Sequence, residues 1–335
     1  MSLIVLFLLF AGAGTTGHAL ESSPMALPGR ASVALPVQLD HAQLLADVKQ
    51  LSAPEFEGRK TGSPGNLKAQ QLIAQRFLQI GLTPFKAGYL QPFSFIHQSG
   101  QRAPAPNQPP ETSYPSAANV LGIIAGTKNP EKILVISAHY DHLGIHQGKL
   151  HPGADDNASG VGTLLALAAW FKAHPPGHSI VFAAFDAEEL GHEGAKAFMA
   201  ELPFPRAQLV MNLNLDMLGH NDQNQIYVAG LYHYPQLRPY VDLAVASSTV
   251  QVLSGHDRPA GQSGMLEDWT HSSDHAAFHK AGIPFLYFGV EDHPDYHAPT
   301  DTFERLNQAF LVQVAELVLQ TALALDAQLG AIKPK

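Results

Sequence analysis

Two hydrophobic patterns alternate through the central and C-terminal parts of the chain. Short, almost continuously apolar runs predict buried strands at about 119–126, 132–139, 179–189, 209–217, 225–229 and 284–288. Longer segments with apolar positions three to four residues apart predict helices at about 40–51, 64–80, 158–173, 240–246, 274–281 and 307–328. This alternation favours an α/β fold with a mixed, mostly parallel central sheet sandwiched by helices.

Other segments lack either pattern. Residues 1–19 hold a short apolar run that ends in small residues, which predicts a secretory signal peptide cleaved after Ala19. Residues 20–36, rich in Pro, Ser and Ala, predict a linker. Weak alternation at 89–95 predicts an edge strand, and the Pro-rich stretch 102–115 predicts a loop. We therefore expect a single domain over residues 37–335.

Composition narrows the class of protein. With 335 residues, 45% of them hydrophobic, the chain can bury a sizeable core. A net charge of -9, only 20 Lys and Arg residues and no basic block argue against a nucleic-acid partner. The chain has no cysteine for a disulfide or a lipid anchor. Together with the signal peptide, this predicts a periplasmic or secreted protein without stable membrane insertion after cleavage.

Polar residues gather at the ends of the predicted strands. His139 and Asp141 follow the apolar run at 133–136, and Asp155 and Asp156 lie on a Gly-flanked turn before the next helix. Ligands in α/β sheets bind at the carboxyl ends of strands, and imidazole together with carboxylate suits zinc. The alternative is structural, since an Asp pair can cap a helix and a single strand-end His is often structural.

Three further positions carry candidate chemistry. Glu188 and Glu189 end the predicted strand at 179–189, and their side chains point differently, so one can bind metal while the other acts as a general base. Asp216 ends an apolar strand, where a carboxylate is costly unless it is paired or bound to metal. His297 lies in a Pro-flanked loop after the last strand, and a loop His taken singly is usually inert.

The chain resembles the co-catalytic dizinc aminopeptidase family, which includes bacterial leucyl aminopeptidases, glutamate carboxypeptidases, glutaminyl cyclases and the inactive transferrin receptor. The resemblance extends from about Leu44 to the C-terminal helix, through the motifs EGRKTGSPGN, NVLGIIAG, SAHYDH, GADDNASG, DAEELG, NLDM, SDHAAF and DYHAPTDT in family order. It implies the zinc-exopeptidase (phosphorylase/hydrolase-like) fold and two Zn²⁺ ions as cofactors. The inserted lid or protease-associated domain of some relatives is not expected.

The resemblance also implies residue roles. One zinc ion would be bound by His139 and Asp216, and the other by Glu189 and His297. Asp155 would bridge the two ions. Glu188 matches the general base, and Asp141 matches the partner that orients His139. A cis peptide bond is implied between Asp155 and Asp156.

Charge counting agrees with this ligand set. Asp155, Glu189 and Asp216 supply three negative charges against the four positive charges of two Zn²⁺ ions, so a bridging hydroxide would make the shell neutral. One position departs from the family, because Ser272 replaces the Tyr that precedes Ser-Asp-His in some members. Tyr296 and His271 are the alternative candidates for stabilising the oxyanion, unless the metal alone does so.

These observations predict an exported, zinc-dependent exopeptidase, an aminopeptidase that binds a peptide's free N-terminus and attacks the first peptide bond with dizinc-bound hydroxide. A carboxypeptidase or a glutaminyl cyclase of the same fold is the nearest alternative. A non-catalytic binding protein that kept the fold is a third, which a lack of bound metal would favour. A serine hydrolase is disfavoured because no Gly-x-Ser-x-Gly motif occurs.

Overall fold

The apolar runs of the sequence form one mixed central sheet. The computed structural model describes residues 38–86, 88–97, 112–259 and 266–333. The predicted signal peptide and linker, and most of the predicted Pro-rich loop, lie outside the described residues. Residues 38–335 belong to one compact unit.

Within the described residues, nine strands form the central sheet in the order β1-β3-β7-β4-β8-β11-β9-β10, and β2 pairs with β3. They are β1 (Thr83–Pro84), β2 (Leu90–His97), β3 (Thr112–Ile124), β4 (Asn129–His139), β7 (His178–Phe185), β8 (Leu209–Leu215), β9 (Gln225–Ala229), β10 (Gln251–Ser254) and β11 (Phe285–Gly289). The central strands β7, β4, β8 and β11 are mutually parallel. Strand β3 is antiparallel to β7, and β9 is antiparallel to β11. A separate hairpin consists of β5 (Gly144–His146) and β6 (Lys149–His151).

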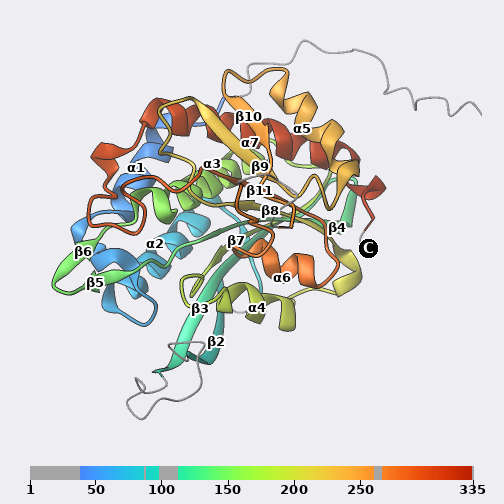
Figure 1. Ribbon diagram of the computed structural model, residues 1–335. Coiled ribbons are helices and arrows are strands. Elements are labelled where there is room, and N and C mark those ends of the chain that lie inside the picture. The colour runs from blue at the N-terminus through green and yellow to red at the C-terminus, as the bar shows by residue number, and fades with distance from the viewer. Residues whose placement is uncertain (1–37, 87, 98–111, 260–265, 334–335) are drawn as a thin grey trace, which may run out of the picture. The chain divides into compact units, whose positions relative to one another are not determined.

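Helices cover both faces of this sheet (Figure 1). They are α1 (His41–Leu51), α2 (Pro64–Ile80), α3 (Gly160–Ala173), α4 (Glu193–Ala200), α5 (Arg238–Val245), α6 (His275–Lys280) and α7 (Gln308–Gln328). On one face α3 packs on the central strands and is joined by α1, α2 and α7, whereas α4 and α6 lie on the other. The predicted α/β sandwich is therefore confirmed.

Burial explains why the central strands read as continuous apolar runs. Every residue of β7 and of β8 is buried, as expected for parallel strands with helices on both faces. On the α4 and α6 side, Val135 and Val181 pack with Phe198 and Phe278. On the other side Gly162 lets α1 approach α3 closely, because a Cβ there would lie 2.4 Å from the Val48 side chain.

The structure differs from the sequence prediction in short elements. Strand β3 begins at Thr112, inside the predicted loop at 102–115, because Thr112 to Tyr114 pair with the end of β2. Helix α4, the β5–β6 hairpin and strands β1 and β10 were not predicted, nor was a tight helical turn at Pro54–Arg59. Most of these elements are too short for a repeat of hydrophobic positions to be recognised in the sequence.

Among the described residues, one helical segment is long and apolar enough to cross a membrane. It spans Gln308–Ala331, and 61% of its apolar window is buried inside the protein. A core helix meets the same criteria, and α7 packs against α1 and α5.

Candidate metal centre

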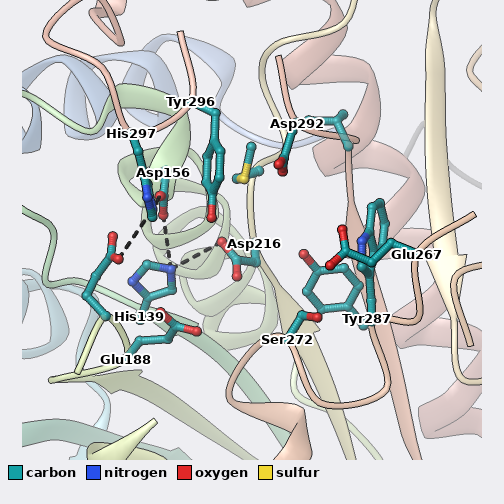
Figure 2. Close-up of a pocket in the computed structure, with 14 residues that line it drawn as sticks. His139, Asp156, Glu188, Asp216, Glu267, Ser272, Tyr287, Asp292, Tyr296 and His297 are labelled. Carbon is teal, nitrogen blue, oxygen red and sulfur yellow. Dashed lines mark hydrogen bonds and ion pairs between the residues drawn. The ribbon is translucent and has the colours of Figure 1, made fainter. Parts of the chain in front are cut away.

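The predicted site residues converge at the carboxyl ends of four neighbouring strands. His139 ends β4, and Glu188 and Glu189 follow β7. Asp216 follows β8, and His297 lies on the loop after β11. Figure 2 shows His139, Asp156, Asp216 and His297 pointing toward one another, with Glu188 beside them. The parallel centre of the sheet thus brings together side chains that are far apart in sequence.

The Asp156 carboxylate links two groups of side chains. Its Oδ1 atom lies 3.2 Å from His139 Nε2, and its Oδ2 atom lies 3.1 Å from His297 Nε2. His139 Nε2 is also 3.2 Å from Asp216 Oδ1, and His297 Nε2 is 3.3 Å from Glu189 Oε2. Ligand atoms around a tetrahedral zinc ion lie about 3.3–3.6 Å apart, so this spacing is close to that of a zinc shell.

The prediction that Asp155 is the bridging carboxylate is wrong, because Asp156 occupies that place. The Asp155 side chain turns away and is fully buried. It accepts a hydrogen bond from the Gly219 N–H at 2.6 Å, and its other oxygen lies 3.1 Å from His293 Nε2. The cis peptide bond is likewise one position further along than predicted, between Asp156 and Asn157.

Two buried side chains hold this turn, and sequence reasoning assigned a role to neither. Asp301 accepts hydrogen bonds from the backbone N–H groups of Asp155 and Asp156 at 2.9 and 3.1 Å. The guanidinium of Arg59 donates to four backbone carbonyls, those of Leu51, Tyr140, Pro152 and Gly153, at 2.7–2.8 Å. Both residues lie in motifs that carry the family resemblance, EGRKTGSPGN and DYHAPTDT, which was the available signal.

Asp141 lies behind His139 and the two glutamates. The Nδ1 atom of His139 is 3.2 Å from the Asp141 backbone carbonyl and 3.7 Å from its carboxylate. The carboxylate accepts hydrogen bonds from the backbone N–H groups of Glu188 at 3.0 Å and Glu189 at 3.3 Å. Asp141 therefore contacts the imidazole that it was predicted to orient, chiefly through its main chain, and also fixes the strand end that carries both glutamates.

Electrostatics at the centre are dominated by carboxylates. Burial would lower the pKa of His139, but Asp216 and Glu188 outweigh it and hold that pKa well above its ordinary value. Burial also opposes protonation of His297, yet hydrogen bonds to Asp156 and Glu189 raise its pKa to about 10. A divalent cation would relieve this excess of negative charge, and imidazole with carboxylate is a donor set that zinc accepts. The residues fit zinc.

Glu188 lies beside the centre, and it belongs to neither group of described side chains with metal-ligand spacing around Asp156. Burial raises its pKa well above the ordinary value, and the nearby Asp216 and Glu189 raise it further, against the effect of His139. Its Oε1 atom lies 3.2 Å from His192 Nε2. A buried carboxyl group with a raised pKa, at the edge of a cleft, is suited to exchanging protons with a substrate.

His142 is a site residue that sequence reasoning missed. Its side chain is fully buried, and its Nδ1 atom lies 2.8 Å from Glu189 Oε1 and 3.5 Å from Asp156 Oδ2. His142, Asp156 and Glu189 form one group with metal-ligand spacing, and His139, Asp156 and Asp216 form another. The signal was its place in SAHYDH, next to the predicted Asp141.

An open cleft with a volume of about 160 Å³ adjoins the centre. Its wall includes Met217, Trp269, Tyr287, Val290 and Tyr296. Of the two alternative candidates for the oxyanion, Tyr296 lines the cleft and its ring stacks on His297 at a centroid distance of 3.9 Å (Figure 2). Ser272 lines the cleft as well, whereas His271 is not among the lining residues.

Comparison with known proteins gives one family. The model of peptidase family M28 matches residues 119–322. Aminopeptidase YwaD of Bacillus subtilis is 33% identical over 233 residues, which cover 66% of this chain and 47% of YwaD. A probable leucine aminopeptidase of Arthroderma otae is 31% identical over 212 residues, 60% of this chain and 56% of that protein. The chain thus spans about half the length of the curated relatives it matches.

Solved structures share the fold at low identity. An aminopeptidase from Aneurinibacillus sp. strain AM-1 superposes with a TM-score of 0.67 at 18% identity, covering 89% of this chain and 95% of that one. BSAP, a zinc aminopeptidase from Bacillus subtilis, gives 0.65 at 18% identity, covering 90% and 97%. A glutaminyl cyclase from Bacteroides thetaiotaomicron gives 0.64 at 17% identity, covering 85% and 97%.

Proposed function

This chain belongs to peptidase family M28, and on that premise we propose that it is an exported metallo-aminopeptidase that removes the N-terminal residue of peptides. The observation that carries the proposal is the Asp156 carboxylate, shared between His139 on one side and His297 on the other. The relatives named as aminopeptidases support the choice of reaction.

The centre would hold two zinc ions. Three residues would bind one ion and three the other, with Asp156 common to both: His139, Asp156 and Asp216, and Asp156, Glu189 and His297. When bound, such ions supply Lewis acidity, which polarises a peptide carbonyl and lowers the pKa of water. Asp141 orients His139 and braces the backbone of both glutamates.

Glu188 is the proposed general base. Its carboxylate takes one proton from the water that attacks the first peptide carbonyl, and later gives that proton to the nitrogen of the leaving amine. The contact with His192 and the Asp141 hydrogen bond to its backbone N–H keep the side chain at the edge of the cleft. Tyr296 lines the same cleft, where its hydroxyl can donate to the carbonyl oxygen during attack.

The lining of the cleft favours a substrate with a free amine. Among the described residues that line it, Glu267 and Asp292 are acidic and none is Lys or Arg. A protonated α-amine is attracted by such a wall, whereas the carboxylate of a C-terminal substrate residue is repelled. An aminopeptidase is therefore favoured over a carboxypeptidase.

Replacing the proposed base tests the mechanism. Glu188→Gln keeps the shape of the side chain but cannot take a proton, so kcat for an aminoacyl-anilide should fall about 10²–10⁴-fold with zinc content unchanged. Glu193→Gln is a matched control, because Glu193 lies on the same segment and pairs with Lys196 at the surface. Near-normal turnover by Glu188→Gln would reject the proposed role.

A substrate panel separates the alternatives. The panel contains an aminoacyl-anilide, the same compound with a blocked amine, an N-blocked peptide with a free C-terminus and an N-terminal glutaminyl peptide. We expect hydrolysis of the compounds with a free amine, no turnover of the two blocked compounds, and no cyclisation of the glutaminyl peptide. The glutaminyl peptide is included because a glutaminyl cyclase shares this fold. The N-blocked peptide is included because Lys60 lines a neighbouring pocket beside His297, and a carboxypeptidase needs a basic side chain near its centre.

We propose in addition that the protein is exported to the periplasm or the medium and is not stably inserted in a membrane afterwards. The apolar run and small residues at 1–19 support this proposal. Amino-terminal sequencing of the protein recovered outside the cytoplasm should begin at Leu20. Full-length protein retained in the cytoplasm would contradict export.

A further inference from the structure

A third imidazole lies against the carboxylates of the candidate centre. His142 is fully buried, with Nδ1 at 2.8 Å from Glu189 Oε1 and 3.5 Å from Asp156 Oδ2. His297 approaches the same two carboxylates from another direction, at 3.1 Å from Asp156 Oδ2 and 3.3 Å from Glu189 Oε2. Both rings therefore face the same small volume, and they meet edge to face at a centroid distance of 5.7 Å.

The His142 ring lies close to the backbone of Gly153 and reaches these carboxylates through Nδ1. Gly153 makes room for the ring, since a Cβ at that position would lie 2.6 Å from His142 Cγ and Cδ2. The Nε2 atom is buried and has no hydrogen-bond partner among the described residues. Burying an imidazole with one unpartnered nitrogen is costly, so the interactions of Nδ1 must compensate.

His142 Nδ1 is in hydrogen-bond distance of Glu189 Oε1 and also lies near a second carboxylate oxygen, that of Asp156. An imidazole N–H points in one direction and serves one acceptor well, yet Nδ1 lies within reach of oxygens from both Asp156 and Glu189. A cation placed among Nδ1 and these two oxygens would be shared by all three, which is the spacing of a metal-ligand group.

We propose that His142 binds metal through Nδ1, as a fourth protein ligand beside Asp156, Glu189 and His297. This inference rests on the metal centre of the proposed function and adds a ligand to it. The other group, His139, Asp156 and Asp216, then keeps three protein ligands. Zinc sites with four protein ligands are closed and structural, whereas those with three keep a position for water or substrate. The two ions should therefore differ in affinity, with the ion beside His142 held more tightly.

Zinc K-edge X-ray absorption tests the ligand count on the full chain loaded with two equivalents of zinc. Three imidazoles shared by two ions give an average of about 1.5 per zinc, whereas His139 and His297 alone give about 1.0. We expect about 1.5 for the wild-type protein and about 1.0 for His142→Ala. A wild-type value of about 1.0 would overturn the proposal.

Zinc titration against a competing chelator distinguishes a ligand from a hydrogen-bond donor. In His142→Asn the amide can still donate to Glu189 but supplies no imidazole nitrogen. If His142 is a ligand, both His142→Asn and His142→Ala should lower the zinc affinity of the tighter site by more than about 100-fold. Losing only a hydrogen bond to a metal ligand usually lowers the affinity by less than this. If Asn restores wild-type affinity, His142 is a hydrogen-bond donor and the proposal fails. His151→Asn is the matched control, since His151 lines the neighbouring pocket and His142 lines it too.

The outcomes separate this inference from the proposed function. Two bound zinc ions and peptide hydrolysis with about 1.0 imidazole per zinc would leave the aminopeptidase proposal intact and refute the role of His142. About 1.5 imidazoles per zinc without hydrolysis of any panel substrate would support the ligand and refute the activity. A purified chain that takes up no zinc would refute both.

Discussion

Two adjacent aspartates differ in what they touch. Asp156 faces the imidazoles of His139 and His297, whereas Asp155 faces the Gly219 N–H and His293. The turn before α3 sends consecutive side chains in opposite directions, so a shift of one residue exchanges a proposed metal ligand for a structural group. The chemistry of the pair is the same at both positions, but the consequences of mutation are not.

Asparagine substitutions at the two positions should therefore have opposite signatures. Asp156→Asn removes the charge shared by both ligand groups, so we expect zinc content to fall toward zero while the protein still folds. Asp155→Asn should keep its zinc but lower the free energy of unfolding by about 1–3 kcal/mol, because a buried acceptor of the Gly219 N–H is weakened or replaced by a donor. Metal analysis and urea denaturation measure the two effects. Zinc loss in Asp155→Asn with retention in Asp156→Asn would reverse the assignment.

The sequence located the candidate residues at strand ends, but it did not resolve the orientation of single side chains. The acids and histidines at strand ends could be located because a continuous apolar run predicts a strand. The end of that run then marks the carboxyl end of the strand. Inside a turn there is no period, so nothing in GADDNASG distinguishes the orientation of Asp155 from that of Asp156. His142 was missed for the same reason, since its direction depends on the path of the chain after β4.

At the scale of elements, Arg59 ties together the segments that carry the ligands. It is buried at the end of the turn Pro54–Arg59 and donates to carbonyls on both sides of the centre: Tyr140, next to His139, and Pro152 and Gly153, just before the Asp156 turn. Burial lowers its pKa to about 10, against the attraction of Asp156 and Asp301, so it remains charged at neutral pH.

Arg59→Lys should be costly although it keeps the charge. An ammonium group cannot reach four carbonyls in the fixed geometry of a guanidinium, so at least one buried acceptor loses its partner. We expect the free energy of unfolding to fall by about 2–3 kcal/mol and zinc affinity to fall with it. Arg238→Lys is the control, because Arg238 pairs with Asp242 at the exposed surface of the protein. Equal effects of the two substitutions in urea denaturation would argue against the bracing role of Arg59.

Long elements were predictable and short ones were not. Helices α2 and α7 and strands β7 and β8 have many buried positions, which give a readable period or a continuous apolar run. The β5–β6 hairpin has three residues per strand and is stabilised by its context, so its sequence carries no such signal. The hairpin separates His142 from the Asp156 turn along the chain, and this is why their proximity was not evident.

At the scale of the whole molecule, a buried histidine outside the centre should couple folding to pH. His275 begins α6 and is fully buried, with its ring 4.5 Å from that of Phe285 and 4.8 Å from that of Tyr287 between centroids. Its Nε2 lies 2.8 Å from the Trp269 carbonyl oxygen. Burial lowers the pKa of His275 to about 3, and the bond to the Trp269 carbonyl opposes this only in part.

The sign of the effect follows from the direction of this pKa shift. An unfolded histidine has a pKa of about 6.5, so below that pH the unfolded chain binds a proton that the folded chain does not. The contribution of neutral His275 is therefore complete above about pH 6.5 and is lost progressively as the pH falls toward 3. Between pH 7 and pH 5 the loss amounts to about 2 kcal/mol.

Comparison of wild type with His275→Gln isolates this contribution. Glutamine can still donate to the Trp269 carbonyl but does not titrate, so the variant should lose about 2 kcal/mol less stability than the wild type between pH 7 and pH 5. Protonation of the metal ligands affects both proteins alike and cancels in the difference. Urea denaturation at several pH values gives the two slopes. Parallel slopes would mean that His275 is protonated in the folded state. A charged imidazole buried among aromatic rings would then need a hydrogen-bond partner for Nδ1. Among the described residues this Nδ1 atom has no such partner.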